Sequence, residues 1–309
     1  MPAQPLSWAK QGLIFKPDPS RDWMRTHAAV PTPLLVEGSL YRVYFSSRDE
    51  ANRSHVGFFE VDLNEPHRIL RATDRPVLTP GPIGCYDADG VYAESVVRRD
   101  GHVWLYTIGV TTGRTAPLFY ASIGCAVSTD GGLTFTKHRS GPVMQRSEFD
   151  PCLVTAPCVL HDEGRWRMWY VSGVAWTQET HGLQSRYYVK YAESDDGLSW
   201  RRDGHVCLEL MGAETNIARL WVVRDGDRYR GWYSVGGGPV GYRIGYAESV
   251  DGLLWTRLDH LAGISPSADG WDAQAQAYPA VVRHDDRWFM FYNGNAFGRD
   301  GIGLAIAPA

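Results

Sequence analysis

The sequence predicts an all-β fold, a five-bladed β-propeller built from four-stranded antiparallel blades. Three observations predict it. A unit of roughly 60 residues recurs five times along the chain. Each copy alternates apolar and polar residues with the period of two that is typical of strands. The 12 Trp, 16 Tyr and 33 Gly are a composition typical of short strands and tight turns. No stretch has a sustained helical period, so we expect few helices.

Each copy of the unit contains a hairpin, in which two runs of strand-forming residues flank a polar turn. The five hairpins are PLLVEGSLYRVYFSSR from Pro33, SVVRRDGHVWLYTIGV from Ser95, CVLHDEGRWRMWYVSG from Cys158, WVVRDGDRYRGWYSVGG from Trp221 and AVVRHDDRWFMFYNGN from Ala280. A third strand follows, such as VKYAES or RIGYAES, and then a turn and a fourth strand that begins with Trp or Phe. Five such units fill the chain, so we expect one domain over residues 1–309.

The two ends of the chain complement one another. The last copy ends in GIGLAIAPA and has only three strands. The stretch WAKQGLIF from Trp8 matches the fourth strands of other copies, WRRDGHVCL from Trp200 and FTKHRSGPVM from Phe135. We therefore expect the N-terminal strand to complete the last blade, because this pairing closes the ring and removes exposed sheet edges.

A nearly identical phrase occurs twice, as YAESDDGLSW from Tyr191 and YAESVDGLLW from Tyr246. Both phrases are shortened relatives of STDGGLTF from Ser128, which fits the Asp-box pattern S-x-D-x-G-x-T-F/W. Asp caps nearby backbone N–H groups and Gly accepts a positive φ, so the pattern predicts the turn between the third and fourth strands. We interpret the phrase, with its Glu193 and Glu248, as scaffold on the outer rim of the propeller.

The bulk composition excludes several classes of partner. The net charge of −4 gives no electrostatic case for nucleic acid or an anionic membrane. No apolar run approaches the roughly 20 residues of a membrane-spanning helix. The start, MPAQPLSWAKQG, lacks the pattern of a signal peptide, so we expect a cytoplasmic protein. The five cysteines have no CxxC spacing, which favours buried thiols over a zinc site. The oligomeric state is not predicted.

The candidate site lies where the innermost strands of the five blades enter the central channel. These stretches are RTHAAVP from Arg25, DADGVYAES from Asp87, DPCLVTAP from Asp150, ETNIAR from Glu214 and WDAQAQAYP from Trp271. We expect catalytic carboxylates among Asp150, Glu214, Asp89 and Asp272, and substrate-binding side chains among Arg25, His27, Asp87, Glu94, Arg219, Trp271, Gln274 and Tyr278. Carboxylates packed around one axis shift each other's pKa values, so that one serves as an acid and another as a base. The alternative is that each Asp caps its own turn.

The cations and aromatic residues of these stretches leave several interpretations open. Arg25 and Arg219 favour bidentate binding of a carboxylate or phosphate, as in an acidic sugar, a sugar phosphate or inorganic phosphate; the alternative is that they neutralise the acids. His27 is a neutral ring, a proton shuttle or a ligand to an axial divalent ion, and no other metal or cofactor is expected. The aromatic residues Trp271, Tyr278, Tyr92 and Trp176 stack on sugar faces or pack in the core.

On these residues the chain resembles the furanosidase-like glycosidases with five-bladed propellers. This superfamily includes glycoside hydrolase families 43, 62, 32 and 68 and the mannoside phosphorylases of family 130. The FDP from Phe149 is similar to the RDP-type motif of the invertase group. The motifs ETNIAR, YRIGYAESVDGLLW, GWDAQAQAYP and FMFYNGNAFG are similar to a bacterial branch often associated with genes for surface-polysaccharide or small-molecule biosynthesis.

The resemblance implies two carboxylates that flank a glycosidic bond. It places Asp150 at the RDP-type aspartate, which holds sugar hydroxyls or tunes the acid, and makes Glu214 the general acid. The base or nucleophile is expected from blade 1, where no aspartate stands in register and Asp22 lies upstream. Either Asp22 reaches into the channel, or Asp87, Asp89 or Asp272 takes this role, or the reaction is not hydrolysis.

Together these observations predict a carbohydrate-active enzyme that cleaves or transfers a glycosyl bond, acting on a small or anionic sugar. Two alternatives stay open. One is a non-hydrolytic biosynthetic enzyme on the same scaffold, such as a lyase, isomerase or cyclase. The other is a catalytically inactive propeller that binds a sugar.

Overall fold

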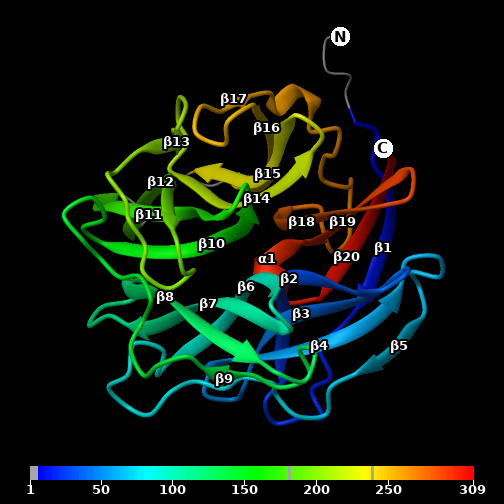
Figure 1. Cartoon of the computed structure of the whole chain (residues 1–309), viewed down its shortest axis with the longest axis horizontal. Helices are drawn as coiled ribbons and strands as arrows, with labels where there is room; N and C mark the ends of the chain where they lie inside the picture. The colour runs from blue at the N-terminus through cyan, green and yellow to red at the C-terminus, as the bar shows by residue number, and fades with distance from the viewer. Residues whose placement is uncertain (1–5, 180–181, 238–239) are drawn as a thin grey trace.

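The computed structural model describes residues 6–179, 182–237 and 240–309. Its regular structure there consists almost entirely of strands (Figure 1). The two helical elements are a 3₁₀ turn, η1 (Asp259–Leu261), and the short helix α1 (Asn295–Gly298). Neither of these described helices is long enough to cross a membrane. The predicted all-β fold is therefore confirmed.

Within the described residues the strands pair in five antiparallel groups of four, which we call blades 1 to 5. Blade 1 holds β2 (Thr26–Glu37), β3 (Leu40–Arg48), β4 (Ser54–Asp62) and β5 (Ile69–Ala72). Blade 2 holds β6 (Gly90–Arg99), β7 (His102–Thr112), β8 (Phe119–Ser128) and β9 (Thr136–Lys137). Blade 3 holds β10 (Leu153–Asp162), β11 (Arg165–Glu179), β12 (Gly182–Ser194) and β13 (Val206–Leu208).

The last two blades follow the same order, except at the chain's ends. Blade 4 holds β14 (Asn216–Asp225), β15 (Arg228–Gly237), β16 (Val240–Ser249) and β17 (Thr256–Arg257). Blade 5 holds β18 (Ala277–His284), β19 (Arg287–Asn293), β20 (Ile302–Pro308) and β1 (Ala9–Phe15). The strand β1 pairs antiparallel with β20, from Ala9 opposite Ile306 to Phe15 opposite Ile302. This pairing confirms that the N-terminal strand completes the last blade (Figure 1).

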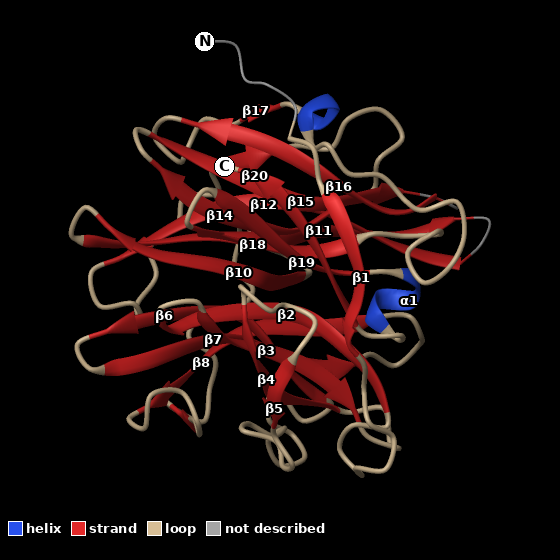
Figure 2. Ribbon diagram, turned by 90° about the vertical axis from the view of Figure 1, so that its right-hand side faces the viewer, coloured by secondary structure: helices blue, strands red, loops and turns tan. Residues whose placement is uncertain are grey.

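The first strand of each blade lies at the centre of the molecule. These strands, β2, β6, β10, β14 and β18, contact one another in that order, and β18 contacts β2 again, so they form a closed ring. Figure 2 shows the strands from the side, and the short helix α1 lies at one face of the molecule, near the centre of the view in Figure 1. The ring brings together residues that lie about one blade apart in sequence, and it positions the site described below.

Local sequence explains the hairpins that join the first two strands of a blade. In blade 2 the turn residues Asp100 and Gly101 both have positive φ, at 50° and 75°. In blade 3, Glu163 and Gly164 do the same, at 51° and 80°. Two consecutive residues with positive φ match the twist of the flanking strands, and Gly at the second position adopts this conformation without steric cost.

The Asp-box turns fasten neighbouring blades to one another. In the turn of blade 2, Asp130 accepts hydrogen bonds from the backbone N–H groups of Leu133 and Thr134, at 2.9 and 3.0 Å. Asp196 and Asp251 cap the equivalent turns of blades 3 and 4.

The glycine carbonyl of each turn accepts a hydrogen bond from an aromatic side chain of the preceding blade. These pairs are Tyr44 with Gly132, Tyr106 with Gly197 and Trp169 with Gly252. The three donors occupy the same place in their blades, on the second strand. These hydrogen bonds therefore join each of the three turns to the preceding blade.

Candidate active site

A cavity of about 1080 Å³ opens at one end of the ring of innermost strands, and residues of all five blades line it. We call it the central cavity. Its aromatic lining consists of Tyr92, Phe119, Trp176, Tyr187, Tyr242, Tyr278 and Phe297, and its amides are Asn52, Gln184, Asn216 and Gln274. Within the part of the chain that the structure describes, the Asp, Glu, Lys, Arg and His residues that line the cavity are Arg48, Asp89, Glu94 and Arg219.

Each innermost strand has a β-bulge where it passes the central cavity. The register breaks between Ala29 and Thr32, Ala93 and Ser95, Thr155 and Cys158, Ala218 and Trp221, and Ala277 and Ala280. One bulged residue per blade lines the cavity, and we call this set the bulge ring: Val30, Glu94, Ala156, Arg219 and Tyr278. All but Glu94 have a positive φ, between 45° and 60°. A bulge re-aims its side chain, and here it turns one side chain per blade into the cavity.

Glu94 and Arg219 of the bulge ring form a buried ion pair across the ring of strands. The Nε of Arg219 donates to Oε2 of Glu94 at 3.1 Å, and Arg219 is 1% and Glu94 3% exposed. The remaining guanidinium N–H groups donate to the carbonyls of Pro31 and Tyr278, at 2.7 and 2.9 Å, and to Oγ1 of Thr32 at 2.9 Å. One arginine of blade 4 thus joins blades 1, 2 and 5 beneath the central cavity.

The environment of Glu94 suits proton transfer near neutral pH. Burial raises the pKa of this carboxyl to about 7, against the opposing effect of the Arg219 charge. Only Oε2 is hydrogen-bonded to Arg219, and Oε1 has no hydrogen bond to a residue that the structure describes. A carboxyl with a pKa near the working pH is populated in both of its protonation states, as general acid–base catalysis requires.

The second carboxylate of the central cavity, Asp89, lies at the entry of β6. Its Oδ2 accepts hydrogen bonds from the backbone N–H and the hydroxyl of Thr112, at 2.7 and 2.8 Å. Asp89 lies in the turn that precedes β6, and Glu94 lies at the β-bulge between Ala93 and Ser95. Asp89 is thus engaged at the entry of blade 2, whereas Glu94 stands at the bulge within β6.

Four expected site acids do not line the central cavity, and we call them the clamp acids: Asp87, Asp150, Glu214 and Asp272. Each forms an ion pair with a cation on or beside the fourth strand of its own blade. The pairs are Asp87 with Lys137, Asp150 with Arg202, Glu214 with Arg257 and Asp272 with Lys10. The expectation that these acids converge on the channel is therefore corrected, because each one fastens the entry of its blade to the outermost strand.

Both carboxylate oxygens of Asp150, one of the clamp acids, are bonded to other groups of the protein. The residue is fully buried, and its carboxylate accepts hydrogen bonds from the hydroxyls of Ser147 and Tyr170, at 3.0 and 3.2 Å. Nε of Arg202 lies 3.1 Å and Nζ of Lys190 3.5 Å from its oxygens. No oxygen of this carboxylate is available to a ligand in the central cavity.

Three further expected residues also stand outside the lining of the central cavity. Arg25 is exposed and donates to Asp22 at 2.9 Å, so Asp22 does not reach into the channel. His27 is buried behind the lining, where burial, with the charges of Arg48 and Arg299, lowers its pKa to about 4. Trp271 packs on Tyr292, with ring centroids 5.0 Å apart, and belongs to the core. The residues brought together as expected are Asp89, Glu94, Arg219, Gln274 and Tyr278, with Tyr92 and Trp176.

Several residues of the cavity were not predicted from the sequence, because they lie on second and third strands. Arg48 ends β3, and Tyr187 and Tyr242 lie on β12 and β16. The two tyrosine hydroxyls contact one another. Both tyrosines stand four residues before the first residue of the repeated YAES phrase, so their equivalent places in the repeat were the available signal. Arg48 carries no such signal.

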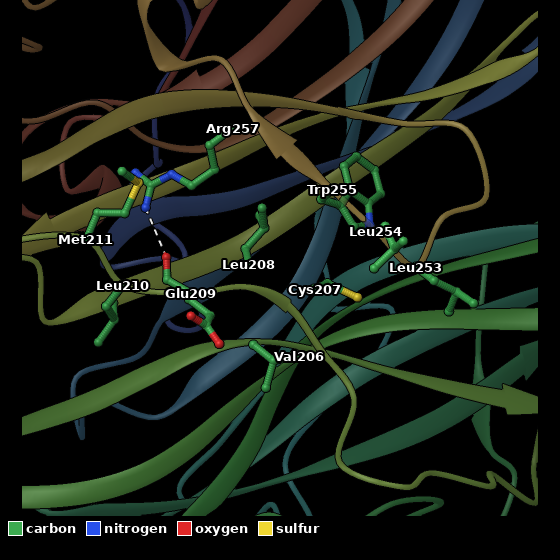
Figure 3. A pocket seen from close by; sticks show the side chains of 10 residues that line it. All are labelled: Val206, Cys207, Leu208, Glu209, Leu210, Met211, Leu253, Leu254, Trp255 and Arg257. Atoms are coloured by element: carbon green, nitrogen blue, oxygen red, sulfur yellow. Dashed lines mark hydrogen bonds between the residues drawn. The ribbon is translucent and has the colours of Figure 1, made fainter.

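A second cavity, of about 430 Å³, lies between the outer strands of blades 3 and 4 (Figure 3). Its walls are mainly apolar, including Leu208, Leu253 and Trp255. Its arginine, Arg257, donates to the carbonyl of Glu209 and is also held by the clamp acid Glu214. This arrangement offers no acid–base pair for chemistry. Among the described residues, no group of three or more His, Cys, Asp or Glu side chains is placed to hold a metal ion.

No protein-family model matches the chain. The uncharacterized protein Rv1502 of Mycobacterium tuberculosis is 39% identical over 302 residues, which cover 97% of this chain and 99% of that protein. The uncharacterized protein MT1551, from a second strain of that organism, is equally similar. These matches span nearly the whole chain.

Solved structures share the fold at low sequence identity. A protein described as a glycoside hydrolase matches with a TM-score of 0.75 and 19% identity, over 98% of this chain and 92% of that protein. A thermostable family-43 glycoside hydrolase matches with a TM-score of 0.66 and 17% identity, over 91% and 88%. A structure from work on the GH130 family of mannoside phosphorylases matches with a TM-score of 0.69 and 13% identity, over 99% and 95%.

Proposed function

The chain belongs to the same family as the mycobacterial protein Rv1502 and has the fold of the propeller glycosidases, and from this premise we propose that it is a carbohydrate-active enzyme. Its substrate is a small or anionic sugar bound in the central cavity, and the reaction cleaves or transfers a glycosyl bond. The observation that carries the proposal is Glu94, a buried carboxyl of raised pKa in a cavity lined by aromatic rings, amides and hydroxyls.

The lining supports a sugar as the ligand. Aromatic faces such as those of Trp176 and Tyr92 stack on the apolar face of a sugar ring, while amides such as Asn216 and Gln274 bond its hydroxyls. The structural neighbours include proteins named as glycoside hydrolases and a structure from work on the GH130 family of mannoside phosphorylases, which supports the same class of ligand.

Glu94 is the proton-transferring group in this proposal. Arg219 holds its Oε2, so that Oε1 is left to meet the substrate. The protonated carboxyl donates its proton to the departing glycosidic oxygen, and the carboxylate then accepts one from the incoming group. Arg219 acts through Glu94 as a positioning residue, because its N–H groups are occupied by groups of the protein.

A non-hydrolytic reaction is the second candidate, and one observation favours it. The other carboxylate that lines the cavity, Asp89, is held by the backbone N–H and the hydroxyl of Thr112, whereas Oε1 of Glu94 has no hydrogen bond to a described residue. A lyase or isomerase that moves one proton needs only the single acid–base group. In a transfer to phosphate, the phosphate itself is the nucleophile and the second carboxylate is again unnecessary.

The test is turnover of a panel of aryl furanosides and pyranosides, including uronides, with and without phosphate. Wild type is compared with Glu94→Gln, which keeps the shape of the side chain and removes its titration. We expect the variant to lose roughly 10²- to 10⁴-fold in kcat, the usual contribution of a general acid–base group. A wild-type rate that depends on phosphate assigns a transfer to phosphate.

The matched control is Glu214→Gln, the same chemical change at a clamp acid outside the central cavity. We expect its kcat to stay within a few-fold of wild type. Loss of turnover in folded Glu214→Gln, with Glu94→Gln unaffected, contradicts the assignment. A folded wild type that turns over no glycoside, but converts a sugar by proton transfer that depends on Glu94, selects the second candidate.

A further inference from the structure

The charged side chains that line the central cavity differ in how they are paired with other groups of the protein. Arg219 is bonded to Glu94, and Asp89 is hydrogen-bonded to Thr112. Arg48, at the end of β3, also lines the cavity and is half-buried. Within residues 6–179, 182–237 and 240–309, Arg48 forms no ion pair with a carboxylate, and its one side-chain hydrogen bond is to Oδ1 of Asn52 at 3.1 Å.

The carboxylate nearest to Arg48 in the sequence is engaged elsewhere. Asp49 accepts hydrogen bonds from the backbone N–H and Nε of Arg53, at 2.8 and 3.0 Å. Its Oδ2 also lies 3.1 Å from Nε2 of His55. Asp49 is therefore turned toward the β3–β4 turn and leaves the guanidinium of Arg48 uncompensated.

The surroundings of Arg48 respond to this uncompensated charge. His27 lies behind the cavity lining, and its pKa is lowered by burial first and then by the charges of Arg48 and Arg299. Burial raises the pKa of the Tyr278 phenol well above its usual value, and Arg48 opposes that rise. Arg48 thus directs a positive field at the blade 1 and blade 5 side of the cavity, where Gln274 and Tyr278 also line the wall.

We propose that Arg48 is the binding site for an anionic oxygen group of the substrate, a carboxylate or a phosphate, at the rim of the central cavity. The planar guanidinium presents two parallel N–H donors that match either group in a bidentate geometry. Asn52 orients the guanidinium by accepting one of its other N–H groups. The inference rests on the proposed function, because it names the substrate class of that same cavity.

The test titrates wild-type protein with sodium phosphate, sodium glucuronate and glucose at constant ionic strength. The ring signals of isotope-labelled histidines are followed by NMR, because His27 lies next to Arg48 and reports its charge. We expect a saturable shift of the His27 signals with at least one of the two anions, at a dissociation constant of about 1 to 10 mM. Tighter binding of glucuronate assigns a carboxylate sugar, and tighter binding of phosphate assigns a phosphate.

Arg48→Gln is expected to weaken this binding at least tenfold, since it removes the charge and the paired donors. The matched control is Arg25→Gln, an exposed arginine paired with Asp22 outside the cavity lining, which should bind as wild type does. The proposal is overturned if neither anion saturates, if glucose binds as tightly as both anions, or if Arg48→Gln binds like wild type.

The two proposals fail separately, because this titration involves no turnover. Anion binding that depends on Arg48, in a protein that converts no sugar, leaves the anion subsite in place and counts against the enzyme. Turnover that depends on Glu94, with neutral and anionic substrates equally good, supports the enzyme and overturns the subsite.

Discussion

The clamp acids recur in blades 2 to 5 and the bulge ring in all five blades, but the two sets differ in what they repeat. The clamp acids keep their chemistry: an Asp or Glu stands at the entry of blades 2 to 5 and pairs with a Lys or Arg of the same blade. The bulge ring keeps only its backbone geometry, and its side chains differ in every blade. One set therefore repeats a contact, whereas the other repeats a position that faces the cavity.

The difference has a structural cause. In blades 2 to 5 the entry of the blade is fastened to the outermost strand, and an ion pair between a carboxylate and a Lys or Arg makes this contact in each of the four. The five bulges meet around one cavity, where a ligand without fivefold symmetry requires a different side chain from each direction. In this propeller, chemistry that is repeated across blades marks the scaffold, and a position at which the blades diverge marks the site.

Removal of a clamp acid tests this comparison most strongly. We expect Asp150→Asn to lower the free energy of unfolding by about 3 to 5 kcal/mol, because Arg202 and Lys190 remain buried without their partner. Urea unfolding measures the loss. Asp195→Asn in the same blade is the control, since its pair with Arg201 is exposed to solvent and contributes little to stability. A variant at Asp150 that is as stable as wild type but inactive places this acid in the site and breaks the comparison.

The pH dependence of stability tests the bulge ring. Burial raises the folded-state pKa of Glu94 to about 7, so between pH 4.5 and 7 the folded carboxyl keeps a proton that the unfolded chain releases. Stability therefore falls as the pH rises through this window, by at most roughly 3 kcal/mol from this one group. We expect Glu94→Gln to lack this fall when unfolding is measured at each pH.

The difference between wild type and Glu94→Gln isolates this effect from His27. The lowered pKa of His27 acts in the opposite sense, because its neutral ring loses stability as the pH falls from 6.5 toward 4. Both proteins carry His27, so its contribution cancels in the difference. A flat difference between pH 4.5 and 7 shows that Arg219 holds Glu94 ionised, and the acid–base role then loses its physical basis.

The fold could be predicted from the sequence because its signals are local and repeated. The alternation of residues around turns such as Asp100–Gly101, and the match of the Trp8 segment to other fourth strands, each lie within a few residues. The site was only partly predictable. Glu94 and Arg219 were found among the entry residues, but the preference for repeated acids selected Asp150 and Glu214 as catalytic. Their cationic partners lie 52 and 43 residues away and are visible only in the fold.

Two further features had no signature in the sequence. A bulge changes which face of a strand a residue occupies. The residue types at Ala156 and Val30 do not predict the bulges found there. Arg48 enters the cavity from a second strand, where the alternating pattern predicts only exposure or burial. Predicting it required the relative positions of blades 1 and 5.

The smallest expected effect concerns the repeated YAES phrase, whose two glutamates each accept a hydrogen bond from the tyrosine two residues earlier. Tyr246 donates to Glu248 at 2.6 Å and Tyr191 to Glu193 at 2.9 Å. We expect Glu248→Gln to lower the free energy of unfolding by about 1 kcal/mol, because Arg228 then also loses one of its two charged partners. Glu193→Gln should cost less, since its pair with Arg165 is longer and more exposed. Urea unfolding and turnover are measured on both variants. Turnover should not change in either, and a folded Glu193→Gln or Glu248→Gln protein without activity would show that a motif repeated across blades carries chemistry after all.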